Sequence, residues 1–113
     1  MGLREDVAAA VSGHRFEEAL PHLGEEVVWD AVGAEPMTGR EAVAAAFREA
    51  GAALASVRTD FTRFRVLSAG DTVVVDSVAI YTEPDGESTV AACDLYDFES
   101  DRLIAIRSYN VEV

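Results

Sequence analysis

The chain has 113 residues, half of them hydrophobic, which is enough for one globular domain with a single core and argues against disorder. Its formal net charge is −12 and all nine cationic side chains are arginines, so we expect no binding to nucleic acid. No apolar run approaches the roughly 20 residues that span a bilayer, and no signal segment is visible. We therefore expect a cytoplasmic protein with no membrane partner.

The sequence offers little material for a metal site. Cys93 has no second cysteine to pair with, and its apolar strand surroundings favour a buried structural thiol. His14 and His22 lack the spacing to carboxylates that metal ligands show. We expect neither a metal ion nor a cofactor.

Two helices are predicted at the N-terminus. Apolar residues at helical spacing form a face that ends around Ser12-Gly13, and they are Leu3, Val7, Ala10 and Val11. A second apolar face runs from Phe16 to Leu23. Pro21 lies inside it, so we expect this second helix to be short or irregular.

A short apolar strand that ends at Asp30 comes next, followed by a loop rich in Gly and Pro. Thr38 and Glu41 form a capping-box pattern. This pattern predicts a third helix that runs through Arg48, with Gly51 as its stop.

From Val57 onward the apolar period changes to two, which predicts a series of long strands joined by turns at 69–71, 83–86 and 99–101. The expected strands are Val57–Leu67, Thr72–Tyr81, Ser88–Phe98 and Leu103–Val111. Helices followed by an antiparallel meander indicate an α+β fold, in which one curved sheet wraps the helices and leaves a cavity.

Two segments carry a resemblance to a known superfamily. The run Asp30–Gly39 reads Asp-Ala-Val-Gly-Ala-Glu-Pro-Met-Thr-Gly and resembles the segment Asp-Pro-Val-Gly-Ser-Glu-Pro-x-Ser-Gly, which carries the catalytic base of bacterial ketosteroid isomerases. The run Asp94–Tyr109 looks like the last hairpin of the ketosteroid isomerase, SnoaL-like cyclase and nuclear transport factor 2 superfamily. The resemblance covers residues 1–113 as one domain. It implies a cone-shaped barrel, with a curved, mainly antiparallel sheet around three N-terminal helices, and a homodimer through the outer sheet face.

The resemblance also implies roles for two carboxyl groups. Asp30 would be the general base that removes a proton beside a carbonyl, and Asp94, kept protonated by apolar surroundings, would donate a hydrogen bond to the enolate oxygen. Strand alternation places Asp94 on one face with Tyr96, and places Asp76 opposite Ser77 and the cavity. The residues expected to bind substrate or support the walls are Trp29, Phe47, Tyr81, Tyr96, Phe98, Ile106, Ser108 and Asn110.

Simpler roles stay open for both acids. Asp30 could cap the turn that follows it, and Asp94 could form a structural ion pair with Arg107 or another arginine. The isomerases also carry a helix-1 Tyr as a second donor, whereas an ungapped alignment back from Asp30 reaches Asp6, which fits a solvated residue at a helix start.

We therefore expect a cofactor-free, isomerase-like enzyme that acts on a hydrophobic carbonyl compound of steroid or polyketide type. Two alternatives remain, a non-catalytic module that binds a hydrophobic ligand and a SnoaL-like polyketide cyclase. The Asp-Arg-Asp set of the superfamily's epoxide hydrolases is missing, because Val74 and Ala92 stand two residues before Asp76 and Asp94.

Overall fold

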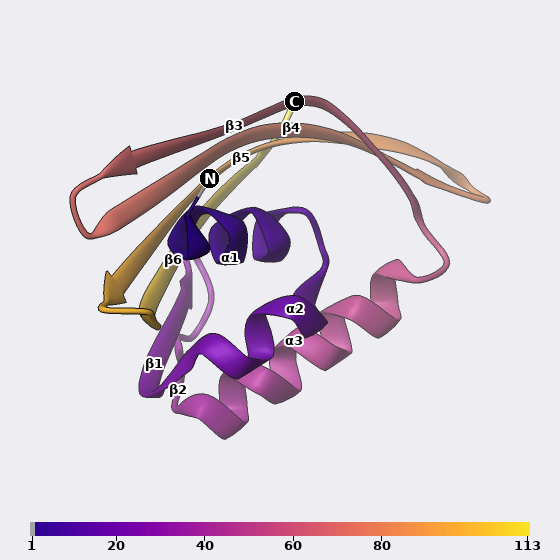
Figure 1. The fold of residues 1–113 in the computed structure, drawn as a ribbon. Helices are drawn as coiled ribbons and strands as arrows, with labels where there is room; N and C mark the ends of the chain where they lie inside the picture. The colour runs from indigo at the N-terminus through magenta and orange to yellow at the C-terminus, as the bar shows by residue number, and fades with distance from the viewer. Residues whose placement is uncertain (1) are drawn as a thin grey trace.

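The computed structural model describes residues 2–113 and shows helices packed on one face of a strongly curved sheet (Figure 1). The helices are α1 (Leu3–Ser12), α2 (Phe16–Ala19), the 3-10 turn η1 (Leu20–His22) and α3 (Arg40–Leu54). The strands are β1 (Leu23–Ala31), β2 (Met37–Thr38), β3 (Arg58–Ala69), β4 (Thr72–Glu83), β5 (Gly86–Glu99) and β6 (Arg102–Glu112). The predicted α+β class is thereby confirmed, as is the short, irregular second helix around Pro21.

The six strands form one sheet in the order β2-β1-β6-β5-β4-β3. All neighbours are antiparallel except β1 and β6, which run parallel. The sheet curves around the helices as expected for a cone (Figure 1), but β2 and β3 remain as free edges and the barrel does not close. None of the helices within residues 2–113 is long and apolar enough to cross a membrane.

The core lies between the concave face of the sheet and the helices. In β4 the side chains of Val73, Val75, Ser77 and Ala79 are buried, and the residues between them are more exposed. This alternation is the period of two read from the sequence. On the other side of the core, α1 packs against β3, β4 and β5, while α3 packs against β1.

The start and end of the third helix differ from the prediction. Thr38 does not cap α3, because it pairs with Val28 in the β1–β2 ladder, and Gly39 takes the N-cap position with φ 98°. The helix also continues past Gly51 to Leu54. A glycine costs a helix about 1 kcal/mol, which burial of Leu54 and Ala50 against the core offsets.

Candidate active site

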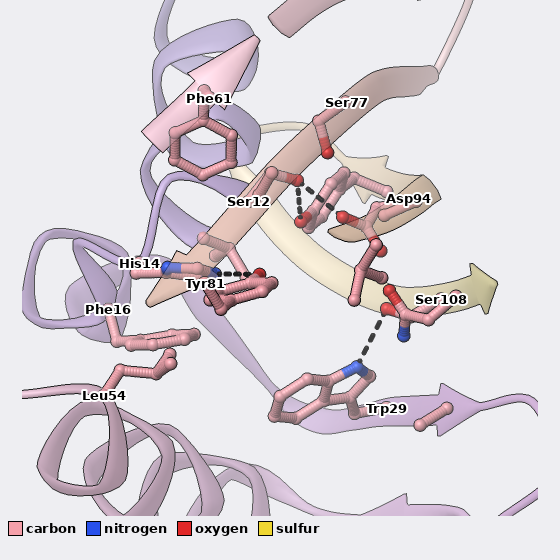
Figure 2. Close-up of a pocket in the computed structure, with 17 residues that line it drawn as sticks. Ser12, His14, Phe16, Trp29, Leu54, Phe61, Ser77, Tyr81, Asp94 and Ser108 are labelled. Atoms are coloured by element: carbon pink, nitrogen blue, oxygen red, sulfur yellow. Dashed lines mark hydrogen bonds between the residues drawn. The ribbon is translucent and has the colours of Figure 1, made fainter. Parts of the chain in front are cut away.

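A cavity of about 360 Å³ lies between α1, the α1–α2 connection and the concave face of the sheet (Figure 2). Its size is near the lower end of the range for small-molecule sites, roughly 300–1,000 Å³. The walls are largely apolar, with Val11, Phe16, Trp29, Ala31, Leu54, Phe61, Ala79, Val90 and Ala92. The polar groups that line it are Ser12, His14, Ser77, Tyr81, Asp94, Tyr96, Ser108 and Asn110.

Asp94 is the buried carboxyl group of this cavity, with a relative exposure of 9%. The Ser12 hydroxyl donates to its Oδ2 over 2.8 Å, and the same Ser12 oxygen lies 2.6 Å from the hydroxyl of Tyr96. A serine hydroxyl has one proton, so the Tyr96 hydroxyl donates to Ser12 while Ser12 donates to Asp94. Figure 2 shows the hydrogen bond from Ser12 to Asp94 as a dashed line.

The environment favours the protonated form of this acid. Burial raises the pKa of Asp94, and hydrogen bonds from Ser12 and Ser108 oppose that rise without cancelling it. Burial, with the nearby Asp94 charge, also raises the pKa values of Tyr81 and Tyr96, so both phenols stay neutral. The cavity thus presents proton donors to an acceptor atom of a bound molecule, in surroundings that strengthen such hydrogen bonds.

Of the side chains expected to bind substrate, Trp29, Tyr81, Tyr96, Ser108 and Asn110 line the cavity. The indole N–H of Trp29 donates to the Ser108 hydroxyl over 3.2 Å.

The three other residues expected to bind substrate do not line the cavity. Phe47 is fully buried between Phe16 and Trp29, with ring centroids 5.3 and 5.2 Å away, and supports the wall from outside the cavity. Phe98 and Ile106 belong to the core cluster and do not line the cavity.

The structure does not bring Asp30 and Asp94 together. Strand β1 stays extended to Ala31, so Trp29 and Ala31 face the cavity while Asp30 faces the outer side of the sheet. There its carboxylate lies 3.8 Å from Nε of Arg107, its partner in the β1–β6 register. The expectation that both acids face one cavity is not met, and a base role for Asp30 stays a prediction from the resemblance. Arg107 contacts Asp30 and not Asp94.

Two further acids lie where the sequence places them. Asp76 is on the outer face, with its carboxylate 3.8 and 3.9 Å from the guanidinium groups of Arg63 and Arg65. Asp6 is exposed in the first turn of α1. The helix-1 side chain that reaches Asp94 is Ser12, and not the residue that the ungapped alignment indicates.

Sequence reasoning missed Ser12 and His14 as cavity residues. Ser12 follows Ala8 by four positions and so shares its helical face, but the burial of that face is seen only in the structure. The position of His14 depends on how the chain leaves α1. Cys93 lies partly buried on the outer face, where burial raises the pKa of its thiol, as expected for an unreactive cysteine.

Comparisons with known proteins identify the fold. Residues 5–106 match the sequence profile of the SnoaL-like domain. A protein of unknown function with the nuclear transport factor 2-like fold, from Cytophaga hutchinsonii, superimposes with a TM-score of 0.79 at 19% identity, over 96% of this chain and 99% of that one. No curated protein sequence gives a significant match.

Structural neighbours include proteins with an assigned or proposed activity. A protein from Pseudomonas putida, proposed to be a polyketide cyclase, has a TM-score of 0.75 at 15% identity, over 96% of this chain and 91% of that one. An LEH-like epoxide hydrolase from Mycobacterium tuberculosis has a TM-score of 0.69 at 18% identity, over 95% of this chain and 83% of that one. At these identities the neighbours show a shared fold and leave the chemistry to the residues of the cavity.

Proposed function

The chain belongs to the SnoaL-like family, and from that premise we propose that it is a cofactor-free enzyme that moves a proton on a hydrophobic carbonyl compound. The observation that carries the proposal is Asp94, a buried carboxyl group with a raised pKa at the wall of an apolar cavity. Burial of a carboxyl group without a counterion costs free energy. A pocket that only binds lipid would gain nothing in return for this cost.

In this mechanism protonated Asp94 donates a hydrogen bond to the carbonyl oxygen of the substrate. As a proton leaves the neighbouring carbon, negative charge develops on that oxygen and the hydrogen bond strengthens. Ser12 and Tyr96 hold the carboxyl group in place through their hydrogen-bond chain. The resulting enolate could be reprotonated elsewhere, which is isomerisation, or could attack a second carbonyl, which is cyclisation.

The walls favour a compact, flat ligand. Trp29, Phe16 and Phe61 present aromatic surface, and the volume of about 360 Å³ suits a molecule of a few fused rings. Aromatic polyketides and steroid-like ketones share this shape and carry the carbonyl that Asp94 would contact. The resemblance to a P. putida protein proposed to be a polyketide cyclase supports the first of these substrate types.

Trp29, the one tryptophan of the chain, supplies a direct test. We expect the fluorescence of Trp29 to change when 2-naphthol, a flat phenol, binds in the cavity. Asp94→Ala should raise the Kd about tenfold by removing the hydrogen-bond partner, and Asp94→Asn, which still donates, should stay within about threefold. The same Kd in all three proteins would contradict contact with Asp94.

Proton transfer is tested with 2-tetralone in D₂O, by following exchange of its α-hydrogens by NMR. Asp94→Ala should slow exchange about 10²-fold, the typical effect of losing one preorganised donor, and Asp94→Asn should slow it less. Asp76→Asn, on the outer face of the neighbouring strand, is the matched control and should leave exchange unchanged. If Asp94→Asn stops exchange as fully as Asp94→Ala, Asp94 is itself the base.

A second candidate is a non-catalytic module that binds a hydrophobic ligand in the same cavity. The position of Asp30 outside the cavity favours it. Naphthol binding that depends on Asp94, without any α-hydrogen exchange, would support this alternative.

The homodimer implied by the family resemblance stays a proposal. The outer face carries apolar side chains that are 43–59% exposed, namely Leu67, Tyr109 and Val111. Light scattering would decide it, with a mass near twice the 12.1 kDa chain as the expected result.

A further inference from the structure

We propose that His14 is the general base of this cavity, accepting through Nε2 the proton that leaves the substrate carbon. The inference rests on the proposed function and adds the group that the site otherwise lacks, because Asp30 lies on the opposite face of the sheet. His14 follows α1 and lines the same cavity as Asp94 (Figure 2).

Aromatic contacts hold the imidazole at the cavity wall. Its ring stacks with Phe16 and Tyr81, both with centroids 5.9 Å away, and is tilted against Phe61 at 5.6 Å. Nε2 lies 3.4 Å from the Tyr81 hydroxyl, a long hydrogen bond that a substrate atom could replace. Tyr81 thus acts as a positioning residue, which keeps Nε2 directed along the cavity wall.

The backbone at His14 is a second, independent observation. Arg15 N–H donates to the Ala10 carbonyl at 2.7 Å, and His14 N–H donates to the Val11 carbonyl at 3.1 Å. These two bonds form a Schellman motif at the end of α1, whose left-handed residue is most often glycine. Here that residue is His14, with φ 66°, although Gly13 stands directly before it. Strained non-glycine residues of this kind concentrate at functional sites.

The other titratable groups in the cavity are poor proton acceptors. Both lining tyrosines are neutral phenols with raised pKa values, and the role proposed for Asp94 is that of a hydrogen-bond donor. Burial lowers the pKa of His14, so its imidazole is neutral near pH 7 and carries a lone pair on one ring nitrogen. Behind the ring, a hollow between α2 and α3 carries Arg15, Glu17, Glu18 and Arg48, which are the charged groups on that side.

The proposed step moves one proton. The C–H bond next to the carbonyl breaks, its proton bonds to Nε2 of His14, and the electron pair forms a C=C bond. The carbonyl π electrons move to the oxygen, which accepts the hydrogen bond from Asp94. The imidazolium then returns a proton to carbon, or first exchanges it with solvent. No oxidant, metal or further reactant is needed.

The test uses His14→Asn, because asparagine tolerates the left-handed conformation and cannot act as a base at neutral pH. We expect α-hydrogen exchange of 2-tetralone to fall about 10²-fold or more, the usual effect of losing a placed base. The Kd of 2-naphthol should stay within about threefold. His22→Asn, in η1 and outside the cavity, is the matched control and should exchange at the wild-type rate.

A pH profile separates a base from a structural residue. Wild-type exchange should fall as the pH drops through the pKa of His14, below about 6.5, and this limb should be absent from the residual activity of His14→Asn. Tyr81→Phe should keep the limb and lose less than about tenfold, as expected for a positioning residue.

The outcomes separate the inference from the proposed function. Exchange that depends on Asp94 but is unchanged in His14→Asn would overturn the inference alone, and loss of exchange in Asp30→Asn would assign the base to the outer acid. Naphthol binding with no exchange in the wild-type protein would also overturn the base role and leave a binding module. No naphthol binding and no exchange would overturn both.

Discussion

Asp76 and Asp94 lie on neighbouring strands, one register position apart, yet on opposite faces of the sheet. Asp76 points outward to Arg63 and Arg65, where water and cations are available to it. Asp94 points inward, forms no ion pair with residues 2–113, and accepts a hydrogen bond from the Ser12 hydroxyl. The difference shows that this sheet uses its outer face for solvated ion pairs and its inner face for a carboxyl group whose protonated form is favoured.

The largest effect on stability is expected from removing the hydroxyl group that donates a hydrogen bond to Asp94. Ser12→Ala leaves Asp94 Oδ2 and Tyr96 Oη without their partner in a buried place, which should cost about 1–3 kcal/mol of the free energy of unfolding. The matched variant is Thr72→Ala, since the Thr72 hydroxyl donates to Asp97 at 2.7 Å in a partly buried position.

Thr72→Ala should cost less, about 0.5–1 kcal/mol, because water can replace the lost hydroxyl at Asp97. Urea unfolding at pH 7 measures both variants. Equal losses of stability would show that a hydrogen bond to a carboxyl group contributes as much on the outer face of the sheet as on the inner face.

An effect of intermediate size on the free energy of unfolding is expected from a change of pH. The folded state raises the pKa of Asp94, so the stability that this group contributes is fully present below its unfolded pKa and is lost as pH rises through the folded value. Asp94→Asn cannot titrate. The wild-type protein should therefore lose stability relative to Asp94→Asn as pH rises from about 4, the ordinary pKa of an aspartate. Urea unfolding of both proteins across pH 3 to 8 tests this, and a constant difference would contradict the raised pKa.

The smallest effect is expected at the outer acid of the first strand. Asp30 and Arg107 form a pair whose side chains are 36% and 59% exposed, so Asp30→Asn should change stability by less than about 1 kcal/mol. From its position we also expect unchanged exchange of 2-tetralone. Abolished exchange with folding intact would support the base role implied by the family resemblance, and would require β1 to turn Asp30 inward in solution.

Patterns along the chain were sufficient to predict most of the fold. The period of two from Val57 onward predicted the strands, and the turn sequences at 69–71, 83–86 and 99–101 predicted their connections, because these signals are local. The limits of α3 were missed. The pairing of Thr38 with β1 and the burial of Leu54 are tertiary effects that local capping rules do not contain.

The sequence by itself determined which residues of each strand share a face, because strand alternation follows directly from residue number, and the family resemblance assigned Asp94 to the inner face. The sequence also determined that the Asp30–Gly39 segment ends a strand and enters a helix. Only the tertiary structure decided that Asp30 turns away from the cavity and that Ser12 and His14 turn into it. These outcomes depend on where β1 stops being extended and on how the chain leaves α1 at a left-handed residue. Both are set by packing between elements distant in the sequence.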